Sequence, residues 1–124
     1  MNMSIKTKYS RRKFEATRVG PTHKAQVGDF EFYITVNSFE DGVPGELFIK
    51  VGNNASKYKG WCYTIAILIS LLLQARVPLE LICKHLCHQS FLPNGFTNNP
   101  DLPNAKSIPD YIGKWLLMNF KKGE

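Results

Sequence analysis

The chain lacks an apolar run long enough to cross a membrane and lacks a disulfide framework. Its longest apolar stretch, Trp61–Leu73, has thirteen residues, whereas a membrane-spanning helix needs about twenty. The three cysteines are an odd number, at spacings unlike those of a small secreted scaffold. The basic N-terminus has no apolar segment behind it, so no signal peptide is predicted. These absences favour a cytoplasmic protein without a membrane segment.

Catalytic motifs are also missing. No Ser/His/Asp set, Cys/His dyad or carboxylate pair stands out, and the few acids of the body are scattered. The phosphate-binding pattern GxxxxGK[ST] does not occur. We therefore expect a protein that is not an enzyme and that needs no cofactor.

Acidic residues are scarce in one region only. Residues 1–24 contain seven basic residues and one acid, Glu15, whereas the remaining hundred residues hold nine of each sign. The net charge of +6 therefore belongs to the N-terminal region. Because Gly20 and Pro21 interrupt regular structure, we divide the chain into a basic arm, residues 1–21, and one globular domain, residues 22–124. The arm is either a solvated tail or a contact site for nucleic acid, a phosphorylated ligand or an acidic partner.

The patterns that are present predict an α+β fold. A strand is expected at about 26–37, where apolar side chains alternate, and a second at 46–51, after a tight turn at Asp41-Gly42. We expect this antiparallel hairpin to pack on a central apolar helix at about 59–75, which has no charge between Gly60 and Ala75. A helix that is apolar nearly all round must be covered on most sides, so later helices or a second subunit must meet its other face.

Two further helices complete the predicted domain. The first runs from Pro78 to about His88, with an apolar stripe at spacings of three and four. The last begins after Ser107, a suitable N-cap, and has Asp110 in its first turn. Its predicted buried face is Ile108, Tyr111, Ile112, Trp115 and Leu116. The long irregular loop between the two helices is rich in proline and asparagine.

The polar stretch between the second strand and the central helix is the candidate ligand site. Its glycine and asparagines allow several backbone N–H groups to converge on one anion, and the positive end of the following helix adds to the attraction. The alternative is an ordinary connection capped by Ser56. Together with nearby cations, the predicted phosphate-binding residues are Lys24, Lys50, Asn53, Asn54, Ser56, Lys57 and Arg76.

The segment Cys83–His88 raises the question of a metal site. On a helix Cys83 and Cys87 share a face and could ligate one zinc ion, but a structural site needs further ligands, which elsewhere only Cys62 and His23 could supply. The alternative is two small apolar core residues with two histidines at the edge, and we predict no metal. His23 could also act as an acid or base near neutral pH.

Several motifs resemble a known family. The hairpin DGVPGELFIKV, the junction AILISLLLQ–VPLELI and the ending SIPDYIGKWL make the chain similar to the accessory C-terminal domain of adenosylcobalamin-dependent ribonucleotide reductases, the TSCPD domain. The resemblance covers about Thr22 to Leu117. It implies no reductase activity, because the catalytic barrel and cobalamin site of those enzymes lie outside this domain. Ala75-Arg76 and Asn53–Ser56 depart from the family pattern, and both lie near the candidate site.

The resemblance and the polar loop together lead to one expected function and one alternative. The expected function is non-catalytic binding of a phosphorylated small molecule, above all a nucleotide, for sensing or sequestration, for example as a viral sponge for a host signalling nucleotide. The alternative is a protein-interaction or regulatory subunit related to ribonucleotide reductase. We also expect a homo-oligomer, with Lys24 or Arg76 of one subunit beside the loop of another. Nucleic-acid binding is less favoured, because the body lacks an obvious aromatic and basic surface.

Overall fold

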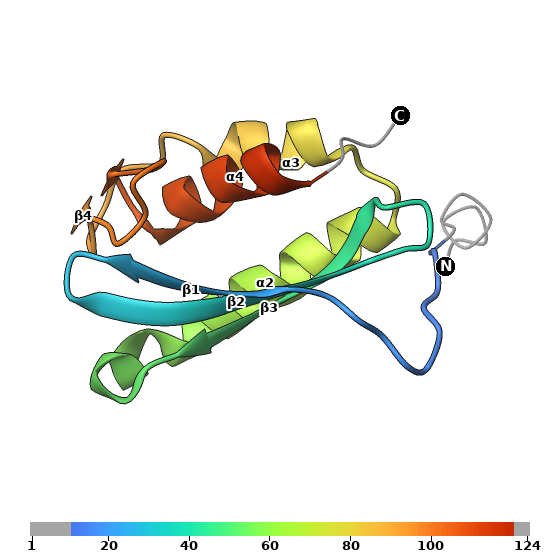
Figure 1. Cartoon of the computed structure of the whole chain (residues 1–124), viewed down its shortest axis with the longest axis horizontal. Helices are drawn as coiled ribbons and strands as arrows, with labels where there is room; N and C mark the ends of the chain where they lie inside the picture. The colour runs from blue at the N-terminus through green and yellow to red at the C-terminus, as the bar shows by residue number, and fades with distance from the viewer. Residues whose placement is uncertain (1–10, 121–124) are drawn as a thin grey trace, which may run out of the picture.

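The computed structural model describes residues 11–120, with the backbone alone for residues 53–55. It confirms the α+β fold, since three helices accompany an antiparallel sheet in the order β1-β2-β3 and a small second sheet (Figure 1). The elements, in chain order, are β1 (Thr22–Val27), β2 (Phe30–Ser38), β3 (Pro44–Val51), the 3₁₀ helix η1 (Asn53–Tyr58), α2 (Lys59–Gln74), α3 (Leu79–Leu86), β4 (Gly95–Phe96), β5 (Asn104–Ala105) and α4 (Ile108–Asn119).

The sheet has one strand more than the sequence predicts. The expected single strand over residues 26–37 is wrong, because the chain reverses at Gly28-Asp29 and Val27 pairs with Phe30. Gly28 has a φ of +59°, a conformation that glycine adopts without the steric cost of a side chain. The predicted turn at Asp41-Gly42 is confirmed, with a φ of +88° at Gly42.

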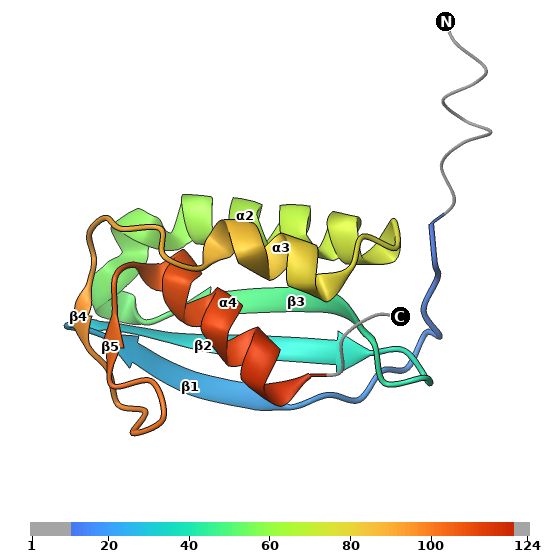
Figure 2. The same ribbon diagram turned by 90° about the horizontal axis from the view of Figure 1, so that it is seen from above.

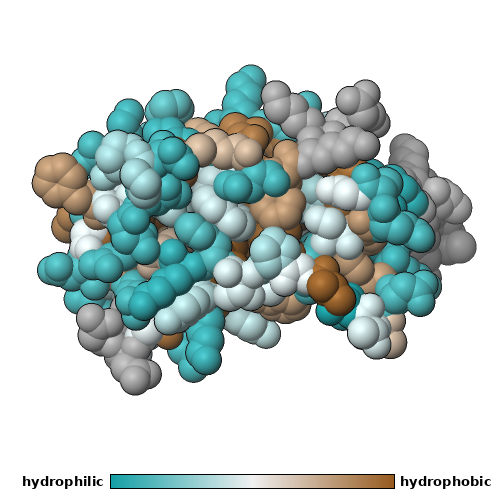
Figure 3. Space-filling model, viewed as in Figure 1, coloured by the Kyte–Doolittle hydropathy of each residue, from teal (hydrophilic) through white to brown (hydrophobic). Residues whose placement is uncertain are grey.

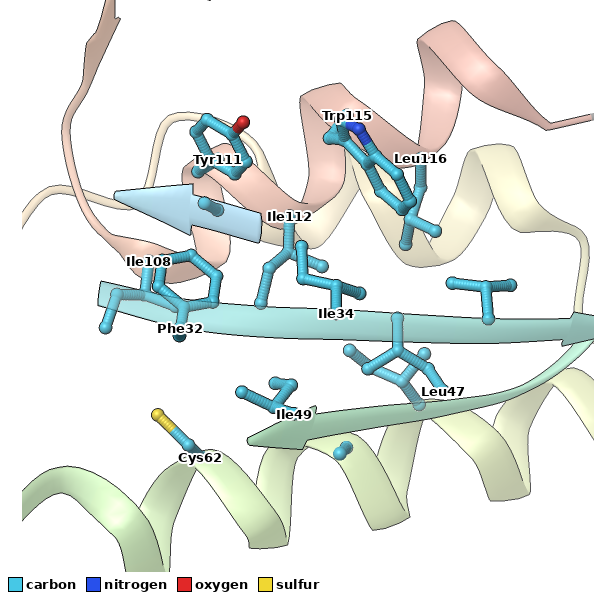
Figure 4. Close-up of a cluster of buried hydrophobic side chains, with 14 of the residues drawn as sticks. Phe32, Ile34, Leu47, Ile49, Cys62, Ile108, Tyr111, Ile112, Trp115 and Leu116 are labelled. Carbon is cyan, nitrogen blue, oxygen red and sulfur yellow. The ribbon is translucent and has the colours of Figure 1, made fainter. Parts of the chain in front are cut away.

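The core lies on one face of this sheet. Phe32 and Ile34 of β2 and Leu47 and Ile49 of β3 point toward the helices, as Figure 4 shows. The predicted buried face of α4 is confirmed: Ile108, Tyr111, Ile112, Trp115 and Leu116 are all buried. The alternate strand residues, Glu31, Tyr33 and Thr35 among them, lie on the opposite face and stay partly exposed.

Helix α2 lies along the outer edge of β3 and seals it, while α3 and α4 lie over the sheet (Figure 2). The N–H of Leu47 donates to Ser70 Oγ at 2.9 Å, and the same hydroxyl donates to the carbonyl of Leu47 at 3.2 Å. Gln74 Nε2 donates to the carbonyl of Gly45 at 3.0 Å. Polar residues inside the apolar run thus satisfy the free backbone groups of an edge strand.

Helices α3 and α4 pack closely and are joined by one buried carboxylate. A Cβ atom on Gly113 of α4 would come within 2.9 Å of Leu86 Cβ, so glycine permits this approach. The predicted N-cap is confirmed, since the N–H of Asp110 donates to Ser107 Oγ at 3.1 Å. The carboxylate of Asp110 accepts hydrogen bonds from the backbone N–H groups of His88 and Lys106.

The described part of the basic arm contacts the body of the protein. Phe14 stacks on Phe39 with 4.4 Å between ring centroids, and the Arg12 guanidinium lies 3.8 Å from the centroid of the Phe39 ring. Arg12 also pairs with Asp41 at 3.1 Å, and Arg18 lies 3.4 Å from Glu46. These contacts hold residues 11–20 against the β2–β3 turn. Within residues 11–120, none of the helices is long and apolar enough to span a membrane.

Candidate functional site

Two of the predicted ligand-binding cations lie on the open face of the sheet. Lys24 and Lys50 both pair with Tyr33 in the strand register, so the two lysines flank this tyrosine from neighbouring strands, roughly 10 Å apart. Lys24 Nζ lies 3.3 Å from a carboxylate oxygen of Glu31, and this hydrogen bond raises the pKa of Lys24. Lys50 is exposed, and no ion pair to it occurs among the described residues.

The predicted loop folds as η1, at the same end of the sheet. Ser56 and Lys57 are exposed, and the ammonium of Lys57 lies 5.3 Å from the centroid of the Tyr58 ring. The side chains of Asn53 and Asn54 lie outside the described residues. Tyr58 is the N-cap residue of α2 and makes no side-chain capping bond, so the alternative of a cap by Ser56 is not observed. η1 leads directly into α2, and the N–H of Lys59 donates to the carbonyl of Ser56, so the unpaired N–H groups of this helical stretch lie at the start of η1.

Arg76 lies at the opposite end of α2. The helix has sixteen residues, which separates Arg76 from η1 by about 24 Å along the helix axis. Within one chain Lys50, Ser56 and Lys57 lie in or next to η1 and Lys24 lies two strands from Lys50, whereas Arg76 lies apart. The shared site between two subunits stays a prediction.

Two of the three cysteines that the sequence offers as metal ligands lie in the core. Burial raises the pKa of Cys62 to about 11 and that of Cys83 to about 12, so both thiols stay protonated near neutral pH. In residues 11–120, no three His, Cys, Asp or Glu side chains gather in a way that could hold a metal ion.

His23 belongs to a small polar cluster under α4. Its Nε2 lies 2.8 Å from the hydroxyl of Tyr111, which accepts a hydrogen bond from Asn99 Nδ2 at 3.1 Å. The hydroxyl hydrogen of Tyr111 can then donate to His23, which requires a neutral imidazole with its proton on Nδ1. Burial lowers the pKa of His23, which favours the same neutral form. The ring also stacks on Trp115 at 4.8 Å between centroids, so this histidine supports packing of α4 on β1.

The most unusual feature of the described molecular surface is a group of exposed apolar side chains on α2 and α3. Each side chain in it is between 40% and 61% exposed. Its members, called the α2–α3 surface below, are Tyr63, Ile67, Leu68, Leu71, Leu72 and Leu81. A groove of about 500 Å³ between the two helices, lined by Leu68, Leu72 and Leu81 among others, is apolar except for His85. By contrast, the face in Figure 3 is mostly hydrophilic, with its apolar residues in separate spots. The sequence predicts an uncovered side of this helix but not the groove.

A mixed pocket at the end of the sheet was missed by the sequence analysis. It has a volume of about 380 Å³ and lies beside the β1–β2 turn. Its lining residues are Gly28, Asp29, Phe30, Tyr58, Leu92, Pro93 and Asn94. Three segments far apart in the sequence meet there, which no local pattern shows. The Gly28-Asp29 pair was the one available signal, since it marks a tight turn.

Comparisons with known proteins point to one family. The family model described as TSCPD domain matches residues 7–119. A vitamin B12-dependent ribonucleotide reductase of Rhodopirellula baltica is 37% identical over 113 residues, which cover 91% of this chain and 11% of that protein. A protein of the same name from Streptantibioticus cattleyicolor is 36% identical over 110 residues, covering 89% of this chain and 18% of its own length. The chain thus spans less than a fifth of these relatives. No solved structure matches the chain.

Proposed function

Because this chain belongs to the TSCPD domain family, whose relatives carry the matching segment as a small part of a ribonucleotide reductase, we propose that it is a non-catalytic protein-interaction module. The proposal rests on one observation, the α2–α3 surface. Six large apolar side chains on adjoining helices are about half exposed to water. Their contact with water is unfavourable in free energy, and a partner that buried them would remove this cost. The module would act by docking this surface on a protein.

The partner that we propose for this surface is a second copy of the chain. The exposed parts of its six side chains amount to roughly 500 Å², if a fully exposed leucine presents about 180 Å². A standard interface buries about 800 Å² per partner, of which about 65% is apolar in homodimers, or roughly 520 Å². The exposed apolar area reaches this size when all six side chains are counted, although Tyr63 and Leu72 lie on opposite sides of α2. None of the six residues is charged, so two copies can meet about a two-fold axis without like-charge repulsion.

A charge at the centre of this surface tests the proposal. Leu68 is 54% exposed, and Leu68→Glu should leave the monomer folded. Removing this half-exposed leucine from both copies should weaken a symmetric dimer by about 2 kcal/mol, or roughly 30-fold, before the cost of burying two carboxylates. Met118→Glu is the matched control, because Met118 is 53% exposed on α4. Light scattering during gel filtration should show an oligomer for the wild type and this control, and a monomer for Leu68→Glu.

A wild-type chain that remains monomeric at high micromolar concentration would contradict the proposed self-association. The docking function itself is then tested by titrating a purified ribonucleotide reductase of the same organism. Binding that Leu68→Glu abolishes and Met118→Glu retains would support docking on that enzyme instead. No binding by the wild type would count against the interaction module.

A second candidate function is the binding of a phosphorylated small molecule, such as a nucleotide that the protein senses or sequesters. It is favoured by two exposed lysines, Lys50 just before η1 and Lys57 within it, and by the N-terminus of η1, which has no side-chain cap. Calorimetric titration with pyrophosphate and nucleotides should show binding that Lys57→Gln weakens several-fold, while Lys84→Gln on α3 leaves it unchanged. Equal affinities of the two variants would refute this placement of the phosphate.

We also propose the cytoplasm as the compartment of this protein. All three cysteines are free thiols, and two of them are buried, as expected for a protein that folds under reducing conditions. Fluorescence imaging or fractionation of a tagged chain checks this placement.

A further inference from the structure

The pocket at the end of the sheet has walls that the fold holds in place. The N–H of Gly28 donates to the carbonyl of Phe96 at 2.8 Å, and Val27 forms a β-bridge with Thr97. The N–H of Gln26 donates to Asn98 Oδ1 at 3.0 Å. These bonds fix the β1–β2 turn against the segment that follows Asn94, so the pocket exists before any ligand arrives.

The approach of these two segments depends on glycine. A Cβ atom on Gly28 would lie 2.8 Å from the carbonyl oxygen of Asn94, and the φ of Gly28 is +59°. Gly95, with a φ of +130°, continues the same wall. Two positive-φ glycines at one junction indicate that the shape of the pocket is built by the backbone and not by mobile side chains.

The chemistry of the lining combines aromatic, aliphatic and acidic groups. Tyr58 meets Phe30 edge-on, with 5.2 Å between ring centroids, and forms an aromatic wall. Leu92 lines the pocket while 75% exposed, and Phe96, on the wall segment, is 79% exposed. Packing within the chain does not explain such exposed apolar side chains next to a pocket, whereas a flat apolar ligand would cover them.

One carboxylate gives this pocket a preference for ligands with hydrogen-bond donors. Asp29 lines it, is exposed, and has no ion pair among the described residues. An ionised carboxylate only accepts hydrogen bonds, and its two oxygens suit a ligand edge with two adjacent N–H donors. The ammonium of Lys57, which is the residue before Tyr58 in η1, lies 5.3 Å from the centroid of the Tyr58 ring. The pocket therefore offers an apolar wall, an acceptor pair and a nearby cation.

We propose that this pocket binds a planar heteroaromatic ring with an N–H donor edge, of the guanine type, with Tyr58 against the ring and Asp29 on its donor edge. The Watson–Crick edge of guanine presents adjacent N–H donors, whereas that of adenine presents an acceptor beside its amino group. Both oxygens of Asp29 can therefore pair with guanine, whereas adenine offers this carboxylate a single donor group. Only the role of Lys57 rests on the second candidate function, because Lys57 would meet the phosphate of a nucleotide whose base occupies the pocket.

The test is an amide NMR titration of the full chain with three probes: guanosine, adenosine and inorganic pyrophosphate. We expect guanosine to shift the amide signals of Gly28, Asp29 and Gly95, and to bind at least tenfold more tightly than adenosine. Asp29→Asn should weaken guanosine binding at least tenfold. Asp101→Asn is the matched control, because this exposed aspartate lies outside the pocket, and it should bind as the wild type does. Dispersed amide spectra establish that each variant is folded.

The possible outcomes separate the ring from the phosphate. No shift with guanosine at its solubility limit, or equal affinities of wild type and Asp29→Asn, would overturn the inference. Guanosine binding that Asp29→Asn weakens, without any response to pyrophosphate, would support the ring pocket and refute the phosphate site. A response to pyrophosphate alone would overturn the ring pocket and leave the second candidate function standing.

Discussion

Replacing the buried carboxylate Asp110 by asparagine probes the junction of α3, the following loop and α4. The side chain of Asp110 is fully buried. It accepts hydrogen bonds from the N–H groups of His88, at 2.6 Å, and Lys106, at 3.0 Å, and it pairs with the ammonium of Lys114 at 3.1 Å. Asparagine has the same shape but only one acceptor oxygen, and its NH₂ group would face a backbone donor.

The magnitude of this change follows from the bonds that are lost. Asp110→Asn leaves one buried N–H donor unpaired and removes the charge that faces Lys114. Hydrogen bonds to charged groups contribute about 1.5–3 kcal/mol each. We therefore expect the free energy of unfolding to fall by about 3 kcal/mol, which lowers the melting temperature by roughly 10 °C for a domain of this size.

The pH dependence gives a second readout of the same group. Burial by itself raises the pKa of Asp110, but the N–H groups of Lys106 and His88 and the charge of Lys114 outweigh it and lower the pKa below its usual 3.8. The stabilisation by Asp110 is therefore complete above the unfolded-state pKa and is lost as pH falls through the lower folded-state pKa. The stability gap between wild type and Asp110→Asn should narrow below about pH 4.

Urea unfolding followed by circular dichroism at several pH values measures both effects. Asp101→Asn serves as the control, because Asp101 is exposed and its substitution should change stability by less than about 0.5 kcal/mol. A loss below about 1 kcal/mol for Asp110→Asn at neutral pH would refute the assigned role. A gap that stays constant down to pH 2 would show that the carboxylate is not stabilised in its charged form.

The helices were predictable because their signals are local. The uncharged apolar run fixes α2 within one residue of the predicted end, and the cap at Ser107 fixes the start of α4. By comparison, β1 was not separated from β2, because the apolar alternation at Ala25 and Val27 is short and resumes at Phe30, directly after the Gly28-Asp29 turn. Its identity depends on pairing with β2 and on contacts with residues 97 and 98, which are distant in the sequence. Strand propensity depends on such context more than helix propensity does.

The relative positions of the candidate residues follow the same division. Lys50, Ser56 and Lys57 lie close together in the sequence, in or next to η1, whereas the length of α2 separates Arg76 from them. The pocket beside Asp29 needs three segments and could not be inferred from any one of them. A local sequence pattern can thus bring residues of one connection together, but it does not show a pocket that three distant segments build.

Two further predictions concern packing against the sheet. Burial lowers the pKa of His23, so the unfolded chain binds a proton first as pH falls through about 6.5, and stability should fall from there to the lower folded-state pKa. His23→Phe, which keeps a ring against Trp115, should remove this decline in unfolding measured between pH 7 and 5; an unchanged slope would contradict the role. Ser70→Ala should cost about 2 kcal/mol in urea unfolding, because the N–H and carbonyl of Leu47 lose their partner at a buried edge. Thr64→Ala, which removes a hydroxyl bonded only to its own helix, should cost much less, and equal losses would mean that the edge of β3 is not sealed by Ser70.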